Sequence, residues 1–316
     1  MATTKLPMFP HTFDSTMLGA FRSCPQKMFR TYVEHWKPKS ESVHLVAGGA
    51  FARGIEVARK AFYEQGASEE DAIATGLHAL LIAYGDFETP ADSAKSATRM
   101  AGALEFYFEN YPLAEASAVP VAFPNGKLAI EFSFAEPLDI LHPVTGDPIL
   151  YTGRADMIAE FCGGQYCVDE KTTSSLGASW GKQWEMRSQF TGYQWAANKA
   201  GMNVQGTLVR GVSILKTKYD HLQHVTYRTP YEVDRWLAQV HRDIERAIEM
   251  WKDDYWDYSL DHACAEYGGC SMVNVCKSSE PASWLPMYFD KRVWDPLARQ
   301  ERTVEEWEAS WGHTTS

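Results

Sequence analysis

Three charged residues in the middle of the chain, Asp156, Asp169 and Lys171, have the chemistry to hold a divalent metal ion beside a cation. They lie in two stretches rich in strand-forming residues, 149–161 and 165–171. Two glycines separate the stretches, which is a signal for a two-residue hairpin turn. With that turn, Asp156 is expected to face Lys171. Asp169 is expected on the face of Lys171, because side chains alternate along a strand.

The same alternation turns the side chain of Glu170 to the opposite face, so only its main-chain carbonyl is available to this site. The predicted register depends on Gly163 and Gly164 forming the turn. A surface salt bridge on a hairpin is the competing interpretation, because such pairs are common and contribute roughly 0–1 kcal/mol. The other motifs of the chain distinguish a metal site from a surface salt bridge.

The length, composition and charge of the chain limit its possible folds and functions. The chain has 316 residues, 45% of them hydrophobic, which is enough for one large domain or two smaller ones. No apolar run of about 18 residues and no signal peptide is found, so we expect a cytoplasmic protein with no membrane contact. The net charge of −11 argues against a simple nucleic-acid binder. Residues 1–60, however, carry nine Lys and Arg against four Asp and Glu, which leaves open a local basic groove or chance clustering.

The first third of the chain has apolar residues at three- and four-residue spacing, which predicts helices. The predicted helices span 13–36, 49–65, 68–84 and 91–111. Strand-forming stretches follow, around the hairpin and beyond one further helix. The predicted later elements are strands at 118–123, 128–134, 205–215 and 221–227, with helices at 180–200 and 229–252.

Strands and helices that alternate through the middle of a chain are typical of an α/β fold. We therefore predict a mixed central sheet with flanking helices. Three consecutive parts are expected. Residues 1–112 form a helical N-terminal part, residues 113–260 form the core, and residues 261–316 form an irregular, cysteine-rich segment that closes onto the N-terminal part.

The helix after the hairpin carries Gln189 and Tyr193, which are four residues apart and so share one helix face. On their own they are equally typical of an ordinary half-buried helix. Taken in order with Gly153-Arg-Ala-Asp156 and Asp169-Glu-Lys171, the string resembles the RecB-like branch of the PD-(D/E)XK nuclease superfamily. The segments 18–27 and 48–56 resemble earlier motifs of the same branch. The resemblance runs from about residue 14 to residue 276.

This resemblance implies a restriction-endonuclease-like core and hydrolysis of DNA phosphodiesters with Mg²⁺ or Mn²⁺. It implies that Asp156, Asp169 and the main-chain carbonyl of Glu170 are metal ligands. Lys171 would stabilise negative charge developing on the phosphate, or orient the attacking water. Gln189 would position Lys171 or that water.

The resemblance also implies residues that contact DNA, which are Tyr193, Arg22 and Lys27. Two further acidic residues, Glu56 and Glu131, are candidate metal ligands. Many members of the branch carry a metal-binding His four residues before the Glu of the second motif, where this chain has Ala52. This chain therefore lacks the His ligand of that set.

Cysteines flank the predicted core, with one before it and three after it. These four residues are Cys24, Cys264, Cys270 and Cys276. Four thiolates suit a [4Fe–4S] cluster and also Zn²⁺. Some RecB-like nucleases place their cluster ligands in this one-plus-three pattern, although the first late gap usually holds two residues and here holds five. A buried helix cysteine is the competing interpretation for Cys24.

The favoured function is a metal-dependent deoxyribonuclease, an exonuclease or end-processing enzyme in recombination, repair or phage DNA metabolism. The chain has no helicase P-loop motif, so it works alone or with a partner such as a strand-annealing protein or a helicase. The alternative is a catalytically inactive iron–sulfur protein that binds DNA or acts as an adaptor.

Overall fold

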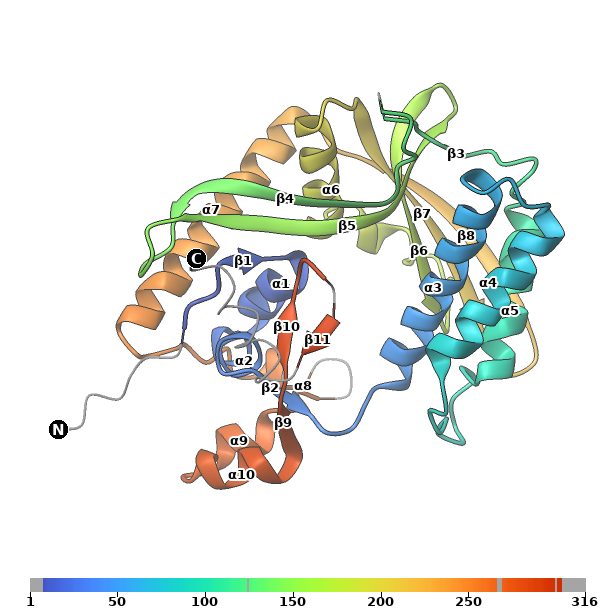
Figure 1. The fold of residues 1–316 in the computed structure, drawn as a ribbon. Helices are drawn as coiled ribbons and strands as arrows, with labels where there is room; N and C mark the ends of the chain where they lie inside the picture. The colour runs from blue at the N-terminus through green and yellow to red at the C-terminus, as the bar shows by residue number, and fades with distance from the viewer. Residues whose placement is uncertain (1–7, 124, 266–268, 299, 303–316) are drawn as a thin grey trace, which may run out of the picture. The chain divides into compact units, whose positions relative to one another are not determined.

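The structure is a computed structural model that describes residues 8–298, except 124 and 266–268, together with residues 300–302 (Figure 1). The chain divides into two compact units. The unit that we call the sheet unit is made of Glu41–Ser133 and Arg154–Val233. The other, which we call the terminal unit, takes in Met1–Ser40, Phe134–Gly153 and Asp234–Ser316.

A mixed sheet forms the centre of the sheet unit. Its strands are β3 (Val119–Pro120), β6 (Gly164–Thr173), β7 (Val204–Ile214), β8 (Tyr219–Tyr227) and the parts of β4 (Ile130–Leu141) and β5 (Pro148–Phe161) that belong to this unit. The order is β5-β6-β7-β8, and β3 and β4 also pair with β5. β6 runs antiparallel to β5 and parallel to β7, and β7 runs antiparallel to β8. This arrangement, with helices on the sheet, confirms the predicted fold class.

Three helices pack together on one face of this sheet (Figure 1). They are α3 (Val43–Tyr63), α4 (Glu69–Tyr84) and α5 (Ala97–Asn110). Their buried apolar residues form one cluster with Val212 and Ile214 of β7. Glycines let α3 and α4 approach closely, because a Cβ on Gly76 would lie 2.6 Å from the carbonyl oxygen of Gly54.

The loop between β6 and β7 contains a short 3₁₀ turn (Lys182–Trp184) and helix α6 (Ser188–Lys199). Buried Arg228 holds this segment in place. Its guanidinium donates to the Thr191 hydroxyl at 2.9 Å and to the Trp184 carbonyl at 2.9 Å. These buried hydrogen bonds fix the 3₁₀ turn and the start of α6 to the residue that follows β8. Buried polar groups left without such partners would cost several kcal/mol.

The terminal unit is built from short elements and one long helix. Its helices are α1 (Ser15–Ser23), α2 (Pro25–Met28), most of α7 (Pro230–Lys252), α8 (His262–Ala265), α9 (Val273–Lys277) and α10 (Pro281–Tyr288), with a π-helical turn at Phe29–Val33. Its short strands are β1 (Thr12–Phe13), β2 (Trp36–Pro38), β9 (Phe289–Lys291), β10 (Val293–Asp295) and β11 (Gln300–Arg302). β2 pairs antiparallel with β9, so an early segment is joined directly to a late one.

The single helix predicted over 13–36 is wrong. α1 ends at Ser23, and the next residue, Cys24, is extended at φ −160° and ψ 113° because it precedes Pro25. The segment 261–316 that we expected to be irregular contains short helices and strands, and its residues 303–316 lie outside the described chain. The three-part division of the chain stays a prediction.

The predicted register of the hairpin is also wrong, because the turn lies one residue earlier in the chain than expected. The turn is formed by Cys162 and Gly163, at φ 48° and 78°, and Phe161 pairs with Gly164. Positive φ at both central residues is what a type I′ turn needs, and that turn matches the twist of the strands. Each residue of β5 therefore pairs two positions earlier on β6 than expected, which leaves every side chain on its predicted face.

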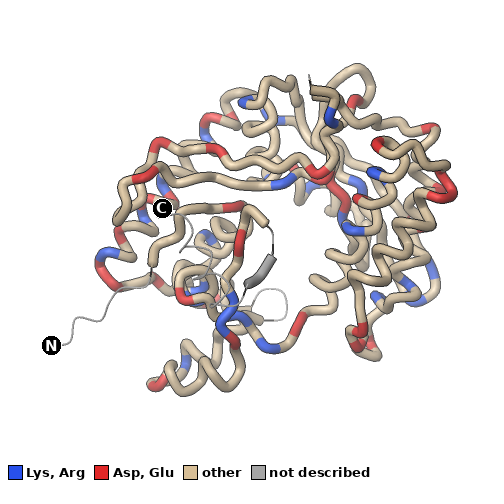
Figure 2. The backbone as a smooth tube through the Cα atoms, in the orientation of Figure 1, with Lys and Arg blue, Asp and Glu red and all other residues tan. Residues whose placement is uncertain are grey.

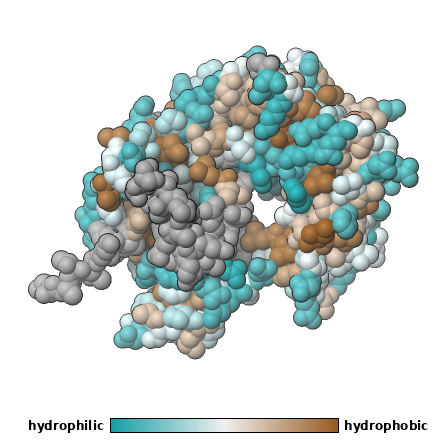
Figure 3. Space-filling model, in the orientation of Figure 1, coloured by the Kyte–Doolittle hydropathy of each residue, from teal (hydrophilic) through white to brown (hydrophobic). Residues whose placement is uncertain are grey.

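Charged residues and hydropathy can be followed along the chain and over one face of it. Figure 2 marks Lys and Arg against Asp and Glu along the elements of both units, and Figure 3 shows hydrophilic side chains interspersed with hydrophobic ones on the visible face. Among the described residues, no helix combines the length and the apolar character needed to cross a membrane.

The turn yields a stability prediction. Replacing Cys162 with Asn should raise the free energy of unfolding by up to about 1 kcal/mol, because Asn tolerates the left-handed backbone that a type I′ turn requires. Gly163→Ala should lower it by about 1–2 kcal/mol, although the added Cβ would meet no atom within 4 Å. Urea unfolding of both variants measures the two changes. A lower midpoint for Cys162→Asn than for the native chain would contradict this turn assignment.

Candidate active site

Two acidic side chains meet where β5 and β6 pair inside the sheet unit. Met157 pairs with Val168, and the same register continued by one pair brings Asp156 opposite Asp169. Asp169 is 1% exposed and Asp156 is partly buried. The backbone N–H of Glu170 donates to Asp156 Oδ2 at 3.2 Å, which orients that carboxylate. The predicted convergence of the two aspartates is therefore present, although Asp156 faces Asp169 rather than Lys171.

Lys171 lies on the same face of β6, where its ammonium group forms an ion pair with Asp169 Oδ2. Its side chain is 29% exposed, so the charge is reachable from solvent. The ammonium nitrogen also lies 6.0 Å from the ring centroid of Phe190 on α6. The odd-numbered residues of this strand thus face α6.

Negative charge accumulates at this position. Burial raises the pKa of Asp156 well above its ordinary value, and the charges of Asp169 and Glu170 raise it further, while Lys171 opposes the shift. Two carboxylates this close repel each other unless a proton or a cation lies between them. Hard oxygen ligands of this kind suit Mg²⁺ or Mn²⁺.

The donor set therefore fits a divalent ion, but it is small. Among the residues that the structure describes, no group of three or more His, Cys, Asp or Glu side chains is arranged to hold a metal ion. A metal ion at this position would have Asp156, Asp169 and the Glu170 carbonyl as its protein ligands. Water and substrate oxygens would complete the coordination, as is usual for Mg²⁺.

The two further acidic candidates differ in their surroundings. Glu131 forms an ion pair with Arg154 at 2.7 Å, and its charge contributes to the raised pKa of Asp156, so it borders the aspartate pair. Glu56, on α3, is instead held by its helix neighbours Arg53 at 2.9 Å and Lys60 at 2.6 Å.

The two predicted residues of α6 bind each other. Gln189 Nε2 donates to the Tyr193 hydroxyl at 2.7 Å, which bears out the shared helix face. Tyr193 is 3% exposed, so most of its ring lies in the core. That burial leaves little of the Tyr193 side chain on the surface for contact with a DNA backbone.

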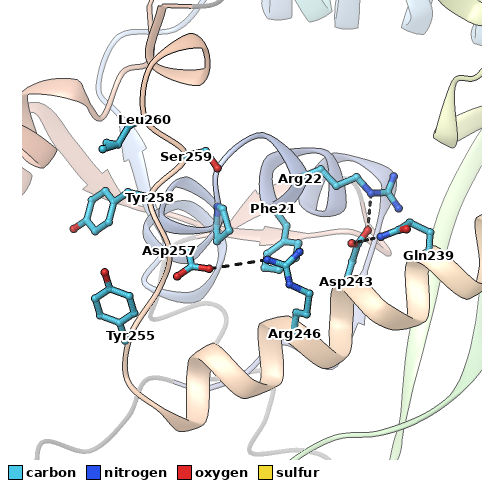
Figure 4. A pocket seen from close by; sticks show the side chains of 11 residues that line it. Phe21, Arg22, Gln239, Asp243, Arg246, Tyr255, Asp257, Tyr258, Ser259 and Leu260 are labelled. Atoms are coloured by element: carbon cyan, nitrogen blue, oxygen red, sulfur yellow. Dashed lines mark hydrogen bonds and ion pairs between the residues drawn. The ribbon is translucent and has the colours of Figure 1, made fainter.

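The predicted DNA contacts Arg22 and Lys27 belong to the terminal unit. Arg22 closes α1, and its Nε donates to Asp243 Oδ2 at 2.6 Å (Figure 4). Lys27 lies in the short helix α2.

A buried polar network that the sequence did not reveal lies on the opposite face of β6. Glu170 forms an ion pair with Arg59 of α3, and their side chains are 2% and 3% exposed. The Tyr107 hydroxyl donates to Glu170 Oε1 at 2.9 Å and accepts from Arg59 Nη2 at 2.9 Å. Arg210 of β7 reaches the same hydroxyl at 3.3 Å.

This network decides the charge state and position of Glu170. Burial alone would raise the pKa of Glu170, but the ion pair with Arg59 and the charge of Arg210 lower it below its ordinary value. The carboxylate stays ionised and is held from several directions. The ion pair with Arg59 therefore anchors the main chain of Glu170, including its carbonyl, from the face of β6 opposite the aspartates.

The four cysteines that flank the core lie in the terminal unit. Cys276 is close enough to Cys270, Cys24 and Cys264 for all three to raise the pKa of its thiol, after burial as the largest cause. The backbone N–H of Cys270 donates to the Cys264 carbonyl at 3.0 Å. The thiols thus gather in one region, without forming a ligand group tight enough to hold a metal ion within the described residues.

The network gives the Glu170 side chain, which faces away from the aspartates as predicted, a structural role. Glu170→Ala should lower the free energy of unfolding by about 3–5 kcal/mol, because it leaves the Arg59 guanidinium buried without its partner. Arg53→Ala on the same helix should change it by less than about 1 kcal/mol, since that side chain is 52% exposed. Urea unfolding compares them, and equal costs would contradict the burial argument.

Two solved structures are similar to this chain at low sequence identity. A solved structure of a protein from Eubacterium rectale, named as a candidate exonuclease, is 13% identical, with a TM-score of 0.48 over 80% of this chain and 87% of that chain. A second solved structure, of SSO0001, is 15% identical with a TM-score of 0.31 and covers 77% of each chain. No curated protein matches.

The family comparison covers most of the chain. Residues 15–277 match the PD-(D/E)XK nuclease superfamily. The matched range contains the aspartate pair, Lys171 and the α6 residues. The chain therefore belongs to the PD-(D/E)XK nuclease superfamily.

Proposed function

We propose that this nuclease is a metal-dependent deoxyribonuclease that processes DNA ends, and that its active site is the aspartate pair on β5 and β6. The observation that carries the proposal is that Asp156 and Asp169 follow the last β5–β6 pair and act on each other electrostatically, with the Lys171 ammonium paired to Asp169. Membership of the superfamily supports hydrolysis of a phosphodiester. Action on ends would deliver single strands to a strand-annealing or helicase partner.

The chemistry needs an activated water and a place for negative charge. A bound Mg²⁺ or Mn²⁺ would bind a phosphate oxygen and lower the pKa of a coordinated water. Asp156 and Asp169 hold the position through their carboxylate oxygens. Lys171 supplies a positive charge where the phosphate becomes more negative. The partly exposed Lys171 side chain can reach a substrate from its buried strand.

Residues around the pair keep it in position. The Glu170 N–H orients Asp156, and the Arg59 ion pair anchors Glu170 from the other face. Preorganised groups of this kind lower a barrier without moving during the reaction. We assign the Gln189 amide, which is bound to Tyr193, to positioning Lys171 or the water.

The first test is cleavage of end-labelled linear, circular and single-stranded DNA. Asp169→Asn and Lys171→Ala should each lower the rate at least about 10²-fold, because each removes charge that acts on the reacting phosphate. Glu160→Gln is the matched control, since Glu160 is exposed on β5 and pairs with Gln165 away from the site. Cleavage should need added Mg²⁺ or Mn²⁺ and stop in EDTA.

Two results would contradict this proposal. Full cleavage in EDTA would show that the reaction needs no divalent metal ion. No cleavage of any DNA form with either metal would favour an inactive protein that binds DNA or acts as an adaptor, in which Ala52 replaces the His that many relatives use.

We further propose that Cys24, Cys264, Cys270 and Cys276 jointly hold a structural [4Fe–4S] cluster, with Zn²⁺ as the alternative occupant. Their mutual electrostatic influence supports the grouping. A Cys₄ set suits either occupant. Holding it would tie α1 to the segment after α7 and add the binding free energy to stability.

Metal analysis of anaerobically purified protein tests the cysteine proposal. About four irons per chain and a brown colour are expected for a cubane cluster. Replacing any one of the four cysteines with Ser should bleach the protein, whereas Cys162→Ser should not, because Cys162 lies in the hairpin turn. Colourless protein with one zinc per chain would show that zinc occupies the cysteine site instead of the cluster. Stable protein free of both metals would remove the proposal.

A further inference from the structure

The sheet unit has a groove of about 930 Å³ between α4 and α5 that the proposed chemistry does not use. α4 packs against α3 and α5, and Figure 1 shows the three helices side by side. Residues of α4 and α5 line the groove together with Pro112, which follows α5. Neither Asp156 nor Asp169 is among the described residues that line it. The groove is therefore a separate feature of the same unit.

The floor of the groove is apolar. Ile73 and Leu77 of α4 are half-buried, and Phe108 of α5 is 3% exposed. Ala74, which also lines the groove, is exposed. Leu81 lies four residues after Leu77 on the same face of α4 and is 46% exposed. A stripe of apolar side chains on α4 therefore runs through the groove and continues beyond it on the surface.

The composition of α4 differs from that of an ordinary surface helix. From Ala72 to Tyr84 the helix has no Asp, Glu, Lys or Arg. Its inner face packs through residues such as the fully buried Leu80, yet Ile82 is 67% exposed. A surface helix normally places charged residues on the face that meets solvent. An exposed apolar patch with a polar rim is instead typical of a site that binds another protein.

Three exposed glutamates border this apolar floor, and we call them the rim glutamates. They are Glu70 of α4 and Glu105 and Glu109 of α5, and the last two share one helix face because they are four residues apart. Within the described chain, none of the three side chains forms a hydrogen bond or an ion pair. Glu69 differs, because its Oε1 accepts from the backbone N–H of Leu113 at 2.5 Å. No Lys or Arg is among the described residues that line the groove.

The charge around the groove selects its occupant. The rim glutamates repel the phosphates of nucleic acids and of anionic membranes. A second copy of this chain, with a net charge of −11, is disfavoured for the same reason. A groove between two helices suits an amphipathic helix with apolar residues at i, i+3, i+4 and i+7. Lys or Arg on both sides of that apolar stripe would meet a glutamate on each helix that forms the groove.

We propose that this groove binds a basic amphipathic helix of a partner protein. The apolar side chains of that helix pack on the floor formed by Ile73, Leu77 and Phe108, and its Lys or Arg side chains lie beside the rim glutamates. The inference concerns recognition of a protein, and it uses neither the aspartate pair nor a metal ion. Its outcome is therefore independent of the proposed nuclease function.

Fluorescence anisotropy with two labelled helical peptides tests this assignment. Both peptides have leucines at i, i+3, i+4 and i+7, and the flanking positions hold Lys in one and Glu in the other. The Lys peptide should bind saturably and at least about tenfold more tightly, because the rim glutamates attract it and repel the Glu peptide. Glu105→Lys combined with Glu109→Lys should remove that preference.

Two further variants separate the groove from the rest of the surface. Ala74→Arg should weaken binding of the Lys peptide at least about tenfold, because the long side chain fills the groove from an exposed position. Glu88→Lys combined with Glu160→Lys is the matched control for the charge reversal. Both of these glutamates are exposed and lie outside the groove, so this variant should bind the Lys peptide as the native protein does.

A Lys peptide of the same composition in scrambled order measures simple charge attraction, because it cannot present one apolar face. It should bind at least about tenfold more weakly than the ordered peptide. Equal binding of the two, no saturable binding of the ordered peptide, or its unchanged binding by Ala74→Arg would overturn the inference. Self-association of the native chain that Ala74→Arg abolishes, measured by analytical ultracentrifugation, would assign the groove to a second copy and overturn it as well.

Discussion

The site depends on keeping two carboxylates together in the interior of a sheet, where each raises the cost of ionising the other. The β5–β6 pairing ends at Met157 and Val168, directly beside Asp156 and Asp169, and the raised pKa of Asp156 is the physical signature of their closeness. A sheet tolerates such a pair when cations compensate it. Lys171 supplies one positive charge, and a divalent ion would supply the rest.

The opposite face of β6 also buries a carboxylate, but there an arginine neutralises it. There Glu170 is buried with Arg59, and Tyr107 and Arg210 satisfy the remaining polar atoms. This ion pair is complete, whereas the aspartate face leaves negative charge in excess. One strand thus carries a neutralised ion pair on one face and, on the other, the carboxylates that we propose as the reacting site. The Arg59–Glu170 pair holds the main chain of β6, which also carries Asp169 and Lys171.

Much of this could be predicted from sequence, and the failures have specific causes. The face of each hairpin residue was predictable because a strand alternates with period two, even though the turn is Cys162-Gly163 instead of Gly163-Gly164. The partner of Asp156 was not, because one turn position shifts each pairing by two residues. Arg59 was hidden because it is 111 residues from Glu170 in sequence, and one buried arginine on an amphipathic helix leaves no spacing signal.

The central claim is that the aspartate pair holds a divalent cation, and calorimetric titration of Mn²⁺ into the metal-free protein tests it most directly. The account predicts saturable binding by the native protein and loss of that binding in Asp156→Asn and Asp169→Asn, because carboxylate oxygens are the ligands that this ion prefers. Glu160→Gln should bind as the native protein does. Undiminished Mn²⁺ binding by both asparagine variants would contradict the account.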